Sequence, residues 1–126
     1  GSNMGHQGAK LDDADARRAF YTWNDELEYD IFGIPRPDIN LVLSVTPEIS
    51  MELARKGKEE KTKVDDDIHE ASLEHLTRAH ETFLEIAHLY PEFQLVDCVQ
   101  GTDLRSIDDI HEEIWSYVQP HLPPTL

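Results

Sequence analysis

The sequence predicts an α/β fold in which two parallel strands are flanked by helices. Residues 39–45 are nearly all apolar or β-branched, which suits a strand buried on both faces, and residues 93–99 form a second short apolar run. Helical apolar spacing precedes, separates and follows these runs, and strands separated by helices pair in parallel. Two strands are too few for a stable sheet, so we expect a truncated part, with two strands and four helices, of a larger one.

Size and composition limit the classes of function. A chain of 126 residues, 39% of them hydrophobic, is long enough for one domain with a real core. The formal charge of −15 argues against nucleic acid or an anionic membrane as the main partner, because both would repel the chain. No apolar run approaches the roughly 18 residues of a membrane span, and no signal-peptide pattern is present. Because Cys98 is the single cysteine, we expect a reducing, cytoplasmic location.

The N-terminal third is predicted to hold a loop and a helix. Residues 1–10 are small, polar and rich in glycine, which is typical of a loop. The helix that follows is expected to end at Gly33. Its apolar positions follow helical spacing: Ala16, Ala19, Phe20, Trp23, Leu27 and Phe32. We expect both tryptophans of the chain, Trp23 and Trp115, to lie in the core.

The middle of the chain begins with the first strand and a second helix. The segment Thr46-Pro47-Glu48 is a strong helix start, because it provides an N-cap, a proline at the first helical position and an acid after it. This helix is expected to end near Gly57. Residues 58–67 are almost purely charged and predict an exposed loop.

The C-terminal half predicts two further helices around the second strand. A long helix is expected from about Ile68 to Leu89, and residues 100–103 are expected to form a turn after the strand. Ser106 is the expected N-cap of a last helix. The inner face of that helix is predicted to consist of Ile107, Ile110, Ile114, Trp115 and Val118.

A basic segment interrupts this acidic chain. Five of its 11 lysines and arginines lie within nine positions: Arg55, Lys56, Lys58, Lys61 and Lys63. Charge runs are usually solvated loops, and Glu59 and Glu60 within the segment favour that interpretation. Its position after a strand–helix unit favours an anionic ligand such as a nucleotide phosphate, because open α/β sheets bind ligands outside the carboxyl ends of their strands. Both interpretations stay open on composition alone.

Two kinds of site are disfavoured by spacing. No Gly-x-x-x-x-Gly-Lys-Ser/Thr segment is present, and Gly57-Lys58 is followed by Glu59 rather than by a magnesium-binding hydroxyl residue. The histidines do not have metal-ligand spacing, since His69-Glu70 and His75 do not match His-Glu-x-x-His. We therefore expect no metal site made by the protein alone, and a structural role for Cys98.

The ordered series of motifs resembles the thymidylate kinase family over essentially the whole chain. The family reads Pro-Asp-Leu before an apolar strand, then Pro-Glu, a charged lid, Tyr-Leu-x-Leu-Ala in a long helix and Ile-Asp-Ala on the last strand. The matching residues here are Pro37-Asp38-Ile39, Pro47-Glu48, Asp67-x-x-Glu70, Phe83-Leu84-Glu85-Ile86-Ala87 and Val96-Asp97-Cys98. The opening Ser2-Asn3-Met4-Gly5-His6-Gln7 is similar to a family segment that follows an Asp-Arg pair. The chain is thus identified as similar to the C-terminal part of such an enzyme, without its phosphate-binding loop.

The resemblance implies a P-loop kinase-like parallel sheet and transfer of the γ-phosphoryl group of ATP to dTMP, with magnesium, in a homodimer. It implies a substrate loop at 1–10 and a lid at 54–67. The residues implied to bind dTMP are Asn3, His6 and Gln7, with His6 where the family has tyrosine near the deoxyribose. The implied catalytic lid cations are Arg55, Lys56 and Lys58. The residues implied to flank the adenine are Val99 and Gln100.

Two alternatives stay open beside this hypothesis. The His6 departure allows a P-loop kinase of another nucleoside or nucleotide. A different class is a non-catalytic acidic α/β module that binds a partner protein. Because the phosphate-binding loop is missing from the sequence, we expect the chain to be inactive as a kinase by itself.

Overall fold

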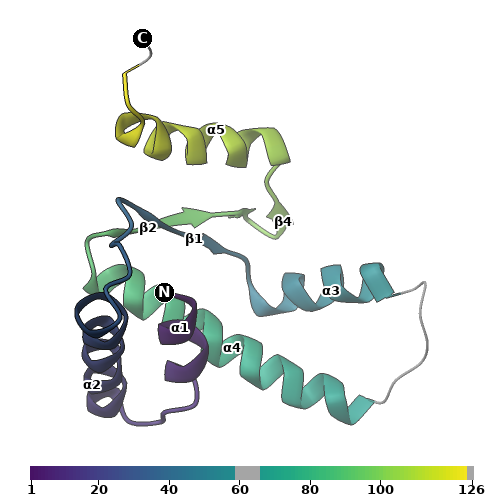
Figure 1. The fold of residues 1–126 in the computed structure, drawn as a ribbon. Coiled ribbons are helices and arrows are strands. Elements are labelled where there is room, and N and C mark those ends of the chain that lie inside the picture. The colour runs from purple at the N-terminus through teal and green to yellow at the C-terminus, as the bar shows by residue number, and fades with distance from the viewer. Residues whose placement is uncertain (59–65, 125–126) are drawn as a thin grey trace.

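The fold is a two-stranded parallel sheet with helices on both sides. The computed structural model describes residues 1–58 and 66–124, without the side chains of residues 57–72. The sheet consists of β1 (Asn40–Ser44) and β2 (Phe93–Asp97), paired in parallel with Leu43 opposite Val96. Figure 1 shows α1, α2 and α4 on one side of the strands and α5 on the other. The prediction of a mixed α/β fold with a parallel strand pair is confirmed.

The connection between the two strands follows the predicted signals. It consists of α3 (Pro47–Lys58) and α4 (Asp66–Leu89). The Thr46 hydroxyl accepts a hydrogen bond of 3.5 Å from the Ile49 amide, so Thr46 caps α3 as expected. The predicted charged loop at 58–67 lies mostly outside the described residues, and α4 already begins at Asp66.

The predicted loop at 1–10 is wrong, because α1 (Ser2–Gly8) is a helix. Its buried residues are Met4, Gly5 and Gly8. A Cβ atom at Gly5 would lie closer than 3.0 Å to the ring of Phe83, and one at Gly8 would lie 2.8 Å from the Tyr21 ring. The two glycines let the α1 backbone approach α4 and α2 closely, and this packing outweighs their poor helix propensity. The described part of the chain therefore has five α-helices rather than the four predicted.

The first long helix keeps its predicted stop but has a different buried face. The α2 helix (Ala14–Asp25) continues as a π-helical segment, η1 (Glu26–Ile31), and Gly33 ends the segment with a φ angle of 67°. The side chains that α2 buries are Tyr21 and Asn24. Trp23 is 54% exposed, so its assignment to the core is wrong.

The hydrophobic core is small and lies on the α4 side of the sheet. Met4, Tyr21 and Ile86 form its buried centre, and Phe20, Tyr90 and Phe93 pack around it. The prediction that the first strand is buried on both faces is wrong, because Leu43 in β1 is 53% exposed. The α5 helix packs against β2 and has few or no contacts with β1, so β1 has less cover on that side of the sheet.

The C-terminal segment departs from prediction in packing rather than in secondary structure. The second strand ends at Asp97, and a short hairpin of β3 (Val99–Gln100) and β4 (Asp103–Leu104) follows, with Gly101 at a φ angle of 66° in the predicted turn. The Ser106 hydroxyl accepts a hydrogen bond of 3.1 Å from the Asp109 amide and caps α5 (Ile107–Val118), before the short helix η2 (Gln119–His121). The predicted inner face is wrong at Ile107 and Trp115, which are 84% and 43% exposed, because α5 touches the sheet mainly at β2.

Candidate functional site

A cavity of about 260 Å³ opens at the carboxyl end of β1, and we call it the strand-end cavity. Its walls come from α1, from β1 and the residues after it, from α3 and from α4. The lining residues are His6, Val42, Leu43, Ser44, Val45, Ser50, Leu76, Ala79, His80, Phe83 and Leu84. Ligands of parallel sheets bind at this end of the strands, and a mostly apolar wall with a few polar groups is typical of a small-molecule site.

Four polar side chains line the strand-end cavity. His6 and His80 come from different helices, Ser44 from the end of β1, and Ser50 from the second turn of α3. Imidazole and hydroxyl groups both donate and accept hydrogen bonds. The cavity therefore offers apolar contact for a ring and several polar groups at its margin, but none of its lining residues has a permanent charge.

Aromatic contacts hold His6 at the cavity. Its ring stacks on the ring of His75 at 6.0 Å between centroids and 22° between planes. It also meets the Phe83 ring edge-on at 5.5 Å and 83°. Because His75 and Phe83 both belong to α4, the position of His6 depends on how α1 docks on that helix.

The α1 helix brings the three predicted dTMP residues onto one face. Asn3, His6 and Gln7 are spaced by three and four residues and are all exposed, opposite the buried Met4 and Gly5. Only His6 of the three lines the strand-end cavity. The side-chain amide of Asn3 instead donates a hydrogen bond of 3.2 Å to the Glu28 carboxylate.

The predicted lid cations lie further along α3. Ser50 lines the strand-end cavity, and Arg55 follows five residues later, roughly 8 Å along the helix axis. Arg55 and Lys56 are exposed, and Lys56 forms an ion pair of 2.7 Å with Glu52 on the same helix. The backbone of Lys58 ends α3, but its side chain lies outside the described residues, so its predicted role is not placed.

The predicted adenine residues do not join the strand-end cavity. Val99 is half-buried and Gln100 is exposed, and both belong to the hairpin that follows β2. The neighbouring Cys98 is buried, and burial raises the pKa of its thiol, which makes it a poor nucleophile. The expected structural role of Cys98 fits this environment.

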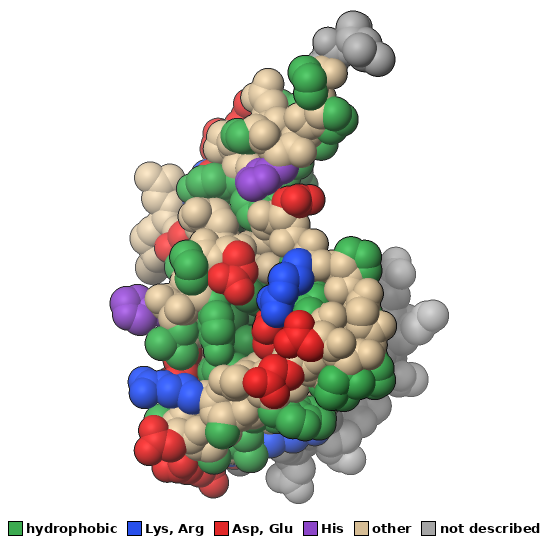
Figure 2. All heavy atoms as spheres, turned by 60° about the vertical axis from the view of Figure 1, so that its left-hand side comes forward, with side chains coloured by type: hydrophobic (Ala, Val, Ile, Leu, Met, Phe, Trp, Pro, Cys, Tyr) green, Lys and Arg blue, Asp and Glu red, His purple; other side chains and the backbone are tan. Residues whose placement is uncertain are grey.

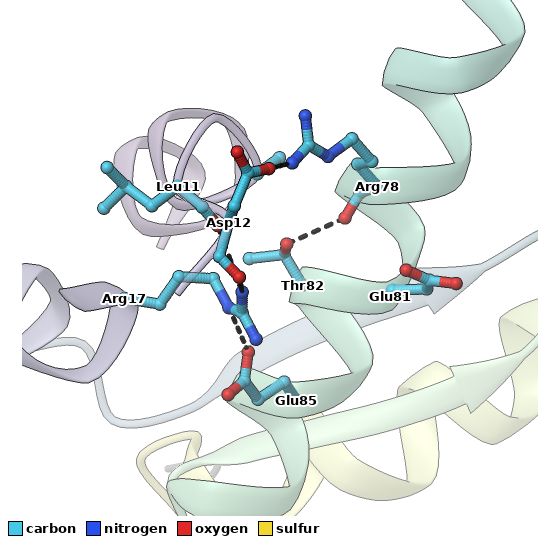
Figure 3. A pocket seen from close by; sticks show the side chains of 8 residues that line it. Leu11, Asp12, Arg17, Arg78, Glu81, Thr82 and Glu85 are labelled. Atoms are coloured by element: carbon cyan, nitrogen blue, oxygen red, sulfur yellow. Dashed lines mark hydrogen bonds and ion pairs between the residues drawn. The ribbon is translucent and has the colours of Figure 1, made fainter. Parts of the chain in front are cut away.

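A second cavity, of about 360 Å³, lies between α2 and α4 and has polar walls (Figure 3). Arg17 donates hydrogen bonds to the Leu11 carbonyl at 3.0 Å and to the Glu85 carboxylate at 3.0 Å. Arg78 is paired with Asp12 in the same cavity. Because both guanidinium groups already have carboxylate partners, this cavity is suited to fastening the segment after α1 to α4 rather than to holding an anion.

The Glu85 carboxylate also organises the core next to this cavity. It accepts a hydrogen bond of 3.2 Å from the hydroxyl of Tyr21, whose side chain is fully buried. Burial and the nearby negative charge of Glu85 raise the pKa of Tyr21 to about 12. Sequence reasoning missed this Arg17–Glu85–Tyr21 cluster, because its members are separated by 64 and 68 residues and carry no local pattern.

Among the side chains that the structure describes, those of residues 1–56 and 73–124, no cluster of three or more His, Cys, Asp or Glu is placed to hold a metal ion. The sequence also has no loop of the type that cradles phosphates. Among the helices described, none is both long and apolar enough to span a membrane.

Comparisons of the chain with protein-family models, with curated proteins and with solved structures give no match.

Proposed function

We propose that this chain is the nucleotide-binding part of an α/β nucleotide kinase of the thymidylate kinase type, and that the strand-end cavity holds dTMP. The supporting observation is the position of His6. The family resemblance assigns His6 to the substrate, and the cavity at the carboxyl end of β1 includes that residue. In this proposal the apolar wall covers the thymine ring, and His80, Ser44 and Ser50 supply hydrogen bonds at its margin.

The proposal separates binding from phosphoryl transfer. Transfer of a γ-phosphoryl group needs a loop that holds the ATP phosphates, and the sequence contains none. The described side chains contain no metal-holding cluster either, so no catalytic step is assigned to them. Arg55 and Lys56 are then cations that approach the phosphate of a bound nucleotide from α3.

A titration followed by amide NMR shifts tests the binding step. Addition of dTMP is expected to shift the amides of Ser44, Val45 and Ser50, more strongly than dUMP, dCMP or dGMP does. His6→Ala and His80→Ala are expected to weaken dTMP binding, whereas His88→Ala, an exposed position at the end of α4, serves as the matched control. Shifts confined to the hairpin at Val99, or the same affinity in all three variants, would refute the assignment.

A coupled assay for ADP release tests the second part. We expect no dTMP-dependent turnover of ATP by this chain. Turnover would show that the chain holds the ATP phosphates by groups that the proposal does not include. A kinase of another nucleotide would be identified by a preference for dUMP, dCMP or dGMP in the same titration.

A partner-binding module is the second candidate, and exposed apolar side chains favour it. Around the end of α2, Trp23, Ile31, Phe32 and Ile34 are each at least 50% exposed. Figure 2, which turns this side of the molecule forward, shows exposed apolar side chains beside acidic ones. If no nucleotide shifts the amides around the strand-end cavity, this candidate replaces the first.

A further inference from the structure

Three imidazole rings gather where α1 packs on α4 beside the strand-end cavity. His6 and His80 line the cavity itself, and His75 stacks on His6 with 6.0 Å between the ring centroids. His6 and His75 are exposed and His80 is half-buried, so the group is accessible to solvent as well as to a molecule in the cavity. The edge-on contact with Phe83 holds the ring of His6 in place before any ligand binds.

Among the described residues that line the cavity, only the histidines change charge near neutral pH. None of these residues is Asp, Glu, Lys or Arg. On the neighbouring segment η1, the Glu28 carboxylate accepts a hydrogen bond from Asn3, one helical turn before His6. The other described titratable side chains on α3 and α4 do not line the cavity: Glu48, Glu52, Arg55 and Lys56 on α3, and Glu74, Arg78, Glu81, Glu85 and His88 on α4. The charge of the described wall therefore depends on whether its imidazoles are protonated.

Positive charge at this cavity matters because the chain as a whole repels a phosphate. Its formal charge is −15 with histidine counted as neutral. Arg55 lies roughly 8 Å along the α3 axis from Ser50, and Lys56 forms an ion pair with Glu52. Histidine takes up a proton between about pH 8 and pH 5, and an imidazolium donates hydrogen bonds from both ring nitrogens. Protonated imidazoles are therefore the groups by which the described wall of the cavity attracts an anion.

The stacked pair favours an anion over a metal ion. Two imidazolium rings 6.0 Å apart repel each other, and an anion beside them offsets that repulsion. Among the side chains that the structure describes, no group of three or more His, Cys, Asp or Glu is arranged around one metal position. A phosphate monoester has several acceptor oxygens and a double negative charge, so it suits donors that come from two helices.

We propose that His6, His75 and His80 form a binding site for a phosphate monoester at the strand-end cavity, and that this site takes up protons as the phosphate binds. The inference deepens the proposed function and rests on it for the identity of the ligand, a nucleotide whose base occupies the cavity. Nucleotide binding is then stronger in mildly acidic solution than near pH 8, whereas a ligand without a phosphate binds equally well in both.

Sulfate tests the anion site without a nucleotide, because it keeps its two negative charges throughout the range in which histidine titrates. It is added in exchange for chloride at constant ionic strength and followed by NMR. We expect sulfate to shift the ring signals of the three histidines and the amides of Ser44 and Val45, with an affinity about tenfold higher near pH 6 than near pH 8. Equal affinity at the two pH values, or no shift at these groups, overturns the proposal.

Glutamine variants identify the groups that take up the protons. His80→Gln keeps a hydrogen-bonding side chain but removes the titratable charge, and it is expected to reduce the pH dependence of sulfate binding. His75→Gln is expected to do the same without altering the cavity lining, so a loss of fold at the lining does not obscure the result. His88→Gln, at an exposed position at the end of α4, is the matched control and should respond like the unmodified chain. An unchanged pH dependence in the double variant His75→Gln/His80→Gln overturns the proposal.

Calorimetric titrations with dTMP and thymidine separate this inference from the proposed function. Repeating them in buffers of different ionisation enthalpy measures the protons taken up on binding. We expect dTMP to bind with proton uptake, and about tenfold more tightly near pH 6.5 than near pH 8, whereas thymidine binds without uptake at either pH. Binding of dTMP without proton uptake or pH dependence overturns the inference and leaves the proposed function standing. Histidine-dependent sulfate binding without any binding of dTMP or thymidine supports the anion site and refutes the proposed function.

Discussion

The docking of α1 on α4 makes Gly5→Ala an informative substitution. The added Cβ would lie closer than 3.0 Å to three carbon atoms of the Phe83 ring, so the ring or the helix has to move. Overpacking of this kind costs about 1–3 kcal/mol, whereas replacing glycine by alanine within a helix contributes about 1 kcal/mol. We expect a net destabilisation of about 1 kcal/mol, which corresponds to a melting temperature lower by roughly 4 °C for a domain of this size.

Urea unfolding followed by far-ultraviolet circular dichroism measures this effect. Gln7→Ala, at an exposed position of the same helix, is the control and is expected to leave stability almost unchanged. Adding Phe83→Leu to Gly5→Ala is expected to recover part of the loss, because the smaller side chain makes room. A rise in stability on Gly5→Ala, as expected from helix propensity alone, would refute the close packing of α1 against Phe83.

Three further substitutions test the core and a helix cap. The unfolded chain loses the Tyr21 proton near its usual pKa of 10.0, whereas the folded chain keeps it to about 12, so Tyr21 should lower stability by roughly 2–3 kcal/mol between these pH values. Tyr21→Phe should remove this contribution in urea titrations at several pH values and leave the smaller slope of Tyr29 and Tyr90, whose pKa values are also raised. Ile86→Ala, at a fully buried position, should lower the free energy of unfolding by about 2–5 kcal/mol, far more than the control Leu89→Ala at a 38% exposed position. Ser106→Ala removes the cap of α5 and should lower the free energy of unfolding by about 1 kcal/mol, as measured by thermal unfolding. An unchanged free energy of unfolding would mean that the cap hydrogen bond is not formed in solution.

Local sequence signals correctly predict those features of the structure that depend only on neighbouring residues. Thr46 before Pro47 fixed the start of α3, and Ser106 fixed the start of α5, because a cap acts within one helical turn. Gly33 and Gly101 marked turns correctly, since both adopt a positive φ angle. Such features need no knowledge of the tertiary fold.

Features that depend on contacts between residues far apart in the chain are not predictable from local sequence patterns. The glycine-rich start looked like a loop, because only docking against Phe83 and Tyr21 shows why glycine is needed in that helix. Trp23 followed the helical spacing but lies outside the face that α2 buries. The candidate site shows the same limit: the family resemblance implies His6, whereas no local pattern in the sequence indicates that His80 joins it from α4.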